Sequence, residues 1–80
     1  MTRETDQIAQ DYSAMGDSVD LITAVIAGES MADESAEDRQ DCVDRNTQHL
    51  ELMVALEDWG SEDMTATNAA ITAGNGYTAS

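Results

Sequence analysis

The fold is decided by the stretch from Thr5 to Ala27, which reads TDQIAQDYSAMGDSVDLITAVIA. Its large apolar residues are spaced 4, 3, 4, 3 and 4 positions apart and are Ile8, Tyr12, Met15, Val19, Ile22 and Ile26. Side chains three and four residues apart share a helix face, so this spacing predicts an α-helix with one stripe that packs on another helix. The alternation at period two that a β-strand needs is nowhere sustained.

The second half of this predicted helix also carries apolar residues outside the stripe. Leu21 and Val25 lie well away from it, so the surface from Val19 to Ala27 is apolar nearly all round. One partner helix cannot cover such a surface, and either a third helix or a dimer contact is therefore expected. The candidate oligomer interface consists of Val19, Leu21, Ile22, Val25 and Ile26.

Gly16 interrupts the apolar pattern. Glycine inside a helix costs about 1 kcal/mol relative to alanine. We expect one bent helix, and the alternative is a split in which Asp17 caps a second helix.

A second helix is predicted after a break at Gly28, which suits the left-handed end of a helix. Its start is expected near Ser30 or Ser35, because each serine is followed three residues later by an acid. Its end is expected at Asp58-Trp59-Gly60, with Trp59 filling the corner between helices.

A third, short helix is predicted from a cap at Ser61 to Gly74, with a frayed end from about residue 75 to residue 80. The whole chain, residues 1–80, is then one small domain. The expected fold class is all-α, a hairpin of two longer helices plus a short C-terminal helix, resembling a three-helix bundle. The chain has no Phe, one Trp and two Tyr, and this thin core predicts an oligomer or a protein partner.

The charge excludes several classes of partner. Seventeen acidic residues against three basic ones give a net charge of −14, which argues against direct binding to nucleic acid or to an anionic membrane surface. The longest apolar run, residues 22–27, is far shorter than the ~20 residues of a membrane span. A single cysteine and no signal-peptide pattern at residues 1–6 predict a cytoplasmic protein.

The acids are concentrated: residues 29–63 hold 12 of the 17. Four recur every seven residues on one helix ridge, and four more broaden it, the full set being Asp33, Glu34, Glu37, Asp38, Asp41, Asp44, Glu51 and Asp58. The centre of this face is expected roughly opposite Val43 and Leu50. Its density, one carboxylate per about 4.4 Å of helix, approaches the one charge per about 3.4 Å of a DNA strand. The face therefore either binds a basic protein groove, is only solvated, or attracts cations loosely.

No pattern for catalysis, for a cofactor or for a specific metal site is visible. His49 has Asn46 three residues before it instead of the Glu of a di-iron motif, and the calcium-loop pattern is absent. His49 is interpreted as a boundary residue without a recognisable Ser or Cys partner. Cys42 is interpreted as a small hydrophobe beside the packing seam. We therefore expect no enzyme activity, no cofactor and no specific metal site.

Three segments of the C-terminal part, RNTQHLELM at 45–53, DW at 58–59 and DMTATNAAI at 63–71, carry a resemblance. They are similar to short uncharacterised proteins of tailed bacteriophages, over about the last 36 residues. The resemblance implies a phage setting, hence the host cytoplasm, and a protein that acts by occupying a host protein. It carries over no catalytic residue.

Three functional hypotheses follow. The first is a non-enzymatic phage-type accessory protein that binds and inhibits or modulates a host protein through an acidic face that mimics nucleic acid. The second is a small virion or scaffold subunit that forms a homo-oligomer through the predicted interface. The third is a weak binder of divalent cations.

Overall fold

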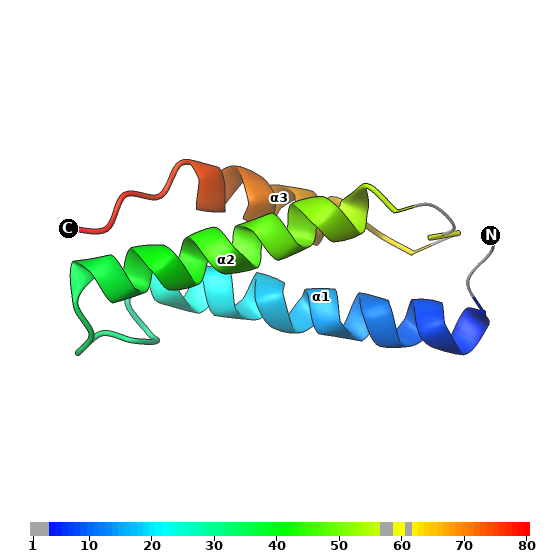
Figure 1. The fold of residues 1–80 in the computed structure, drawn as a ribbon, viewed down its shortest axis with the longest axis horizontal. Helices are drawn as coiled ribbons and strands as arrows, with labels where there is room; N and C mark the ends of the chain where they lie inside the picture. Colours follow the sequence, from blue (N-terminus) through cyan, green and yellow to red (C-terminus); the bar gives the residue numbers. More distant parts are fainter. Residues whose placement is uncertain (1–3, 57–58, 61) are drawn as a thin grey trace.

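The structure, a computed structural model, describes residues 4–56, 59–60 and 62–80. In that part of the chain it contains three α-helices and no strand: α1 at Thr5–Ile26, α2 at Ala36–Val54 and α3 at Thr65–Asn75. Successive helices run in opposite directions, and each contacts the other two, in a body of 42 × 19 × 18 Å (Figure 1). The predicted all-α hairpin with a shorter third helix is thus confirmed, whereas the oligomer stays a prediction. No helix among the described residues has both the length and the apolar character to cross a membrane.

The first helix is continuous across Gly16, so the alternative of a split there is wrong. It ends as predicted at Gly28, whose φ of 79° lies in the left-handed region that glycine tolerates best. The Gly28 N–H donates to Val25 O at 3.1 Å, and the Glu29 N–H donates to Ala24 O at 2.9 Å. This pair of bonds is a Schellman motif, which satisfies the last carbonyls of the helix.

The second helix begins at the later of its two predicted starts. Ser35 is its N-cap, and the Ser35 Oγ accepts a hydrogen bond from the Asp38 N–H at 3.1 Å. The predicted end at residues 58–60 is wrong, because the helix stops at Val54. The chain folds back there, and the Trp59 indole N–H donates to Met53 O at 3.0 Å. Trp59 thus fills the corner between α2 and α3, with its ring centroid 6.5 Å from that of Tyr12.

The third helix starts and ends later than predicted. Its expected cap, Ser61, lies outside the described residues. Asp63 is beside the start: its Oδ1 accepts from the Thr65 N–H at 2.9 Å, and Thr65 lowers the pKa of this carboxyl through side-chain and backbone hydrogen bonds. Gly74 was expected to stop the helix, but it is a buried helical residue and α3 runs on to Asn75.

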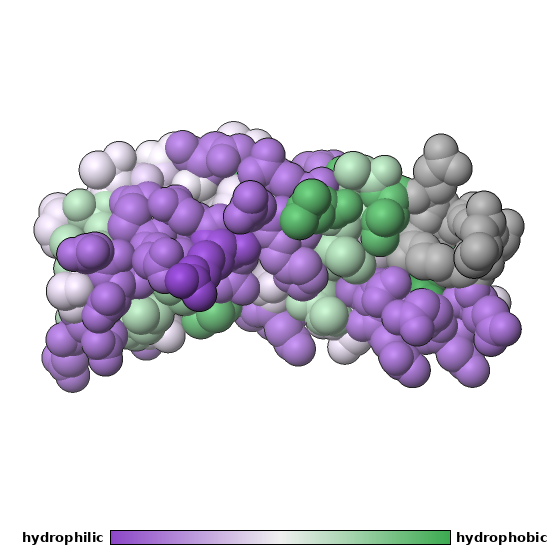
Figure 2. All heavy atoms as spheres, viewed as in Figure 1, coloured by the Kyte–Doolittle hydropathy of each residue, from purple (hydrophilic) through white to green (hydrophobic). Residues whose placement is uncertain are grey.

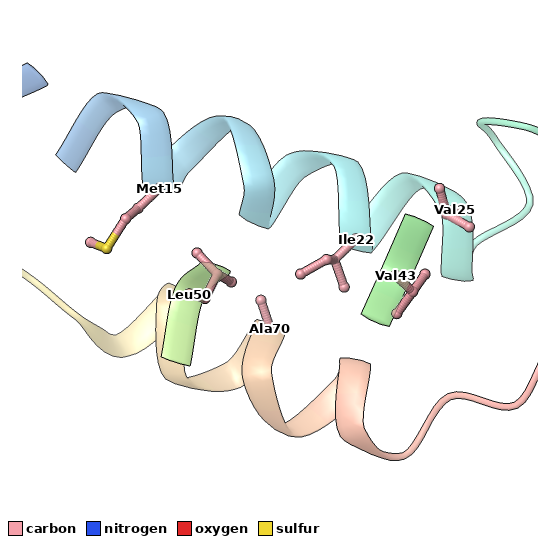
Figure 3. Packing of buried hydrophobic residues seen from close by; sticks show 6 residues of the cluster. All are labelled: Met15, Ile22, Val25, Val43, Leu50 and Ala70. Atoms are coloured by element: carbon pink, nitrogen blue, oxygen red, sulfur yellow. The ribbon is translucent and has the colours of Figure 1, made fainter. Parts of the chain in front are cut away.

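The core lies between all three helices. Figure 3 shows its six buried side chains converging, namely Met15, Ile22 and Val25 of α1, Val43 and Leu50 of α2, and Ala70 of α3. Ile22 and Val25, at the apolar end of α1, are therefore buried within a single chain, in a cluster to which α2 and α3 both contribute.

Candidate functional site

The candidate site is the acidic surface of α2 and of the turn before it. All of its predicted residues that the structure describes are exposed, namely Asp33, Glu34, Glu37, Asp38, Asp41, Asp44 and Glu51. Asp58 lies outside the described residues. The structure thus brings the members within α2 onto one solvent-facing surface of a single rigid element.

The acids cover one flank and the outer side of α2. Val43, Thr47 and Leu50 are the buried line of this helix. At 3.6 residues per turn, the ridge of Glu37, Asp44 and Glu51 lies about 100° around the axis from that line, not opposite it as expected. Asp38 and Asp41 are the members that point away from the core.

The ridge of Glu37, Asp44 and Glu51 runs along the side of α2 that faces α3. Gln40 and Thr47, which lie on that side, both contact the C-terminal part of the chain. Residues 64–80 contain no charged side chain. The ridge therefore borders an uncharged helix, and nothing in α3 compensates its charge.

The two arginines of α2 do not neutralise the ridge either. Arg45 pairs with Asp41 at 2.9 Å, and both side chains are more than half exposed, so the pair contributes little. Arg39 turns toward the end of the chain, where its Nη2 donates to Ser80 O at 2.6 Å and its Nη1 lies 3.5 Å from the Tyr77 hydroxyl. Among the described residues, Asp44 accepts a hydrogen bond only from the neutral Gln40 amide, at 3.0 Å. The ridge keeps its negative charge.

The end of the chain lies along α2 instead of fraying. The Gln40 side chain acts as a clamp on two peptide groups: its Nε2 donates to Tyr77 O at 3.1 Å, and its Oε1 accepts from the Ala79 N–H at 2.8 Å. Tyr77 is half-buried against the core. The polar residues Arg39 and Gln40 could not be assigned this role from the sequence, because their partners are main-chain atoms some 40 residues away.

His49 has a partner that the sequence did not reveal. Its Nδ1 lies 3.0 Å from the Ser18 Oγ of α1, and which atom donates depends on the tautomer. Ser18 is only 7% exposed, and no pocket is found in the described structure. The pair is a hydrogen bond between α1 and α2. A catalytic role for His49 gains no support.

The five residues of the predicted oligomer interface are divided by the fold. Ile22 and Val25 are 1% and 2% exposed within one chain. Val19 and Leu21 are half-buried and pack against the same core. Of the five, Ile26 alone is exposed. Unless the bundle opens, a second copy could contact, among these five residues, only Ile26 and the solvent-facing parts of Val19 and Leu21.

The described residues contain no group of three or more His, Cys, Asp or Glu side chains placed to hold a metal ion. Cys42 is half-buried, and the Asn46 amide donates to its main-chain oxygen at 2.8 Å. The acidic ridge is therefore a row of separate carboxylates along a helix, which is suited to extended charge recognition.

Comparisons with protein-family models, with curated proteins and with solved structures found no match to this chain. The similarity to phage proteins consequently stays a prediction.

Proposed function

We propose that this chain is a non-enzymatic interaction protein that uses the acidic surface of α2 to bind a basic surface of another protein. The observation that carries the proposal is the ridge of Glu37, Asp44 and Glu51: exposed, on one rigid helix, and left unneutralised by Arg39 and Arg45. A basic protein surface is the complement of such a ridge.

The spacing of the ridge supports a partner that otherwise binds nucleic acid. The ridge charges repeat every seven residues, about 10.5 Å along the axis, and the outer acids Asp38 and Asp41 stand in the first of the two intervals. The five acids of α2 give one carboxylate per about 5.7 Å of helix, against one charge per about 3.4 Å of a DNA strand, so a groove lined with Lys and Arg for a phosphate backbone would meet a sparser row of charges of the same sign. The similarity to phage proteins adds the expectation that occupying such a groove inhibits or modulates a host protein.

The acidic surface of α2 also has a cost that supports a role in binding, because Glu37 and Asp44 each stand within four residues of Asp41. Carboxylates three and four residues apart on a helix destabilise it by a few tenths of a kcal/mol per pair. This chain buries only six hydrophobic side chains among its described residues, so that repulsion is significant. A net charge of −14 would also steer a basic partner toward the chain and make association salt-dependent.

The test compares two triple variants of equal net charge in capture experiments from a bacterial lysate at low salt. One replaces Glu37, Asp44 and Glu51 by Gln, Asn and Gln. The other replaces the exposed α1 residues Asp6, Asp17 and Asp20 by Asn. We expect the ridge variant to lose the captured protein, the α1 variant to retain it, and added duplex DNA to displace it. Equal retention by the two variants would show that the ridge has no binding role.

A further inference from the structure

The C-terminal end of α2 carries an apolar patch formed by Leu52 and Leu56. These side chains are 65% and 44% exposed, whereas the core leucine Leu50 is fully buried. Figure 2 shows apolar surface gathered over this end of α2 and hydrophilic surface over much of its N-terminal part. The patch thus adjoins Glu51, the last acid of the ridge, and lies beyond the acids of the N-terminal part of the helix.

Leu52 is not an edge of the core. It lies half a turn, about 180°, around the axis from Val43 and seven residues after Arg45, on the line of α2 that points away from α1 and α3. Leu56 follows one turn later, in the turn that closes on Met53 O at 3.0 Å. Both leucines are exposed to solvent, and Leu52 lies on the outer side of α2, next to the acidic surface.

We propose that Leu52 and Leu56 are the apolar end of the same docking surface whose charged part is the ridge of Glu37, Asp44 and Glu51. The occupant is a cationic segment of another protein that carries apolar side chains beyond its basic residues. This inference rests on the proposed function and specifies its partner. A groove that binds only nucleic acid would have no apolar side chains to pack on Leu52 and Leu56.

The dimensions of the surface define the partner further. Along α2, Leu52 is about 12 Å from Asp44 and about 22 Å from Glu37 at 1.5 Å rise per residue. A stable interface needs roughly 800 Å² from each partner, far more than two leucines supply, so patch and ridge must be covered together. The partner segment therefore carries its apolar side chains about 12 to 22 Å from the Lys or Arg residues that pair with Asp44 and Glu37.

Charge excludes the other occupants. A second copy would bring another chain of net charge −14 against the ridge, and the repulsion would act over the Debye length of about 8 Å. An anionic membrane surface is repelled by the same acids. Only a cationic partner satisfies both parts of the surface.

The test uses two synthetic helical peptides of lysine and alanine with the same number of lysines. One ends in two leucines a turn apart, and the other has glutamines in their place. Binding is measured by calorimetry at low and at physiological salt, with the full chain and three variants. These are Leu52→Gln combined with Leu56→Gln, the triple ridge variant, and Ile26→Gln as the control for an exposed apolar residue at the far end of the bundle.

We expect the leucine peptide to bind the wild-type chain about tenfold more tightly than the glutamine peptide. The leucine variant should lose this preference while keeping its circular dichroism spectrum, and Ile26→Gln should retain it. Equal affinity of the wild-type chain for the two peptides, with binding still lost in the ridge variant, would overturn the patch but keep the acidic surface. Binding that is unchanged in the ridge variant, or absent for both peptides, would overturn both.

Discussion

The second helix packs on its two neighbours in different ways. Toward α1 it contributes Val43 and Leu50, and the other large, fully buried side chains of the core are Met15 and Ile22 of α1. The buried residues of α3 are all small, namely Thr67, Ala70 and Gly74. The large, fully buried side chains of this chain thus lie in α1 and α2. The third helix packs through small residues, which let its backbone come close to α2.

Because α3 lies so close to α2, their contact does not tolerate a larger residue at position 74. A Cβ on Gly74 would overlap the Thr47 hydroxyl, and it would come within 3.2 Å of two further atoms of that side chain. The Thr47 Oγ1 is itself buried without a hydrogen-bond partner in the described structure. The α1–α2 contact is thus stabilised by buried apolar volume, whereas the α2–α3 contact is limited by how closely Gly74 and Thr47 fit together.

The largest effect is expected in the α1–α2 contact. Leu50→Ala should lower the free energy of unfolding by about 2–5 kcal/mol, because it removes a fully buried side chain and leaves a cavity. Leu52→Ala, two residues on and exposed, should change it by no more than about 0.5 kcal/mol. Chemical denaturation measures both. Similar losses in the two variants would contradict the assignment of the core.

The next effect tests the contact limited by shape. Gly74→Ala should destabilise by about 1–3 kcal/mol through overlap with Thr47, and Thr47→Ala in the same chain should restore part of that loss. Gly16→Ala is the matched control, since nothing lies within 4 Å of its Cβ position, and it should stabilise the helix by about 1 kcal/mol. Thermal unfolding distinguishes the signs. Stabilisation by both alanines would mean that α3 does not approach α2 this closely.

A smaller effect is expected where the end of the chain lies on α2. Gln40→Ala removes the bonds to Tyr77 O and from the Ala79 N–H, at a cost of about 1 kcal/mol. The Ala79 amide should then exchange with solvent markedly faster in hydrogen-exchange NMR. The exposed Gln48→Ala should leave that rate unchanged. If Ala79 exchanges rapidly in the wild-type chain, the clamp is absent in solution.

The smallest effect concerns the start of α3. The hydrogen bonds from Thr65 favour the charged carboxylate and hold the pKa of Asp63 below its ordinary value of 3.8. The stability from this contact is therefore present above pH 3.8 and is lost as the pH falls through the lower, folded-state pKa. An NMR titration of the Asp63 carboxyl should show the lowered midpoint, and Thr65→Ala should move it toward 3.8. A midpoint at or above 3.8 in the wild-type chain would contradict the hydrogen bond.

Local patterns predicted the elements but not all of their ends. The stripe from Ile8 to Ile26 and the glycine at position 28 gave the bounds of α1, because both act within a few residues. The stripe was wrong at its C-terminal end, where Val25 is buried and Ile26 is exposed. The end of α2 was missed, because Trp59 folds back onto Met53 O. Gly74 was interpreted as a helix stop, because composition alone cannot distinguish a terminal glycine from one that admits a neighbouring side chain.

The candidate site divides in the same way. The exposure of the acids from Asp33 to Glu51 could be predicted, since seven-residue spacing keeps charges off the buried line of a helix. Three other features could not be predicted: the contact of Arg39 with the end of the chain, the Ser18–His49 hydrogen bond and the exposure of Leu52. Each depends on which side of α2 meets which neighbour.

By itself, the sequence determined that this protein forms helices, where α1 begins, two possible starts for α2, and that 12 of the 17 acids lie between residues 29 and 63. Propensity, capping and apolar periodicity act over a few residues and need no knowledge of the rest of the chain. Only the tertiary structure decided that Ile22 and Val25 are buried within one chain, and that the acidic ridge is left unneutralised beside an uncharged helix. The reason is physical: burial and charge compensation depend on contacts between residues far apart in sequence, and only the packed chain sets those distances.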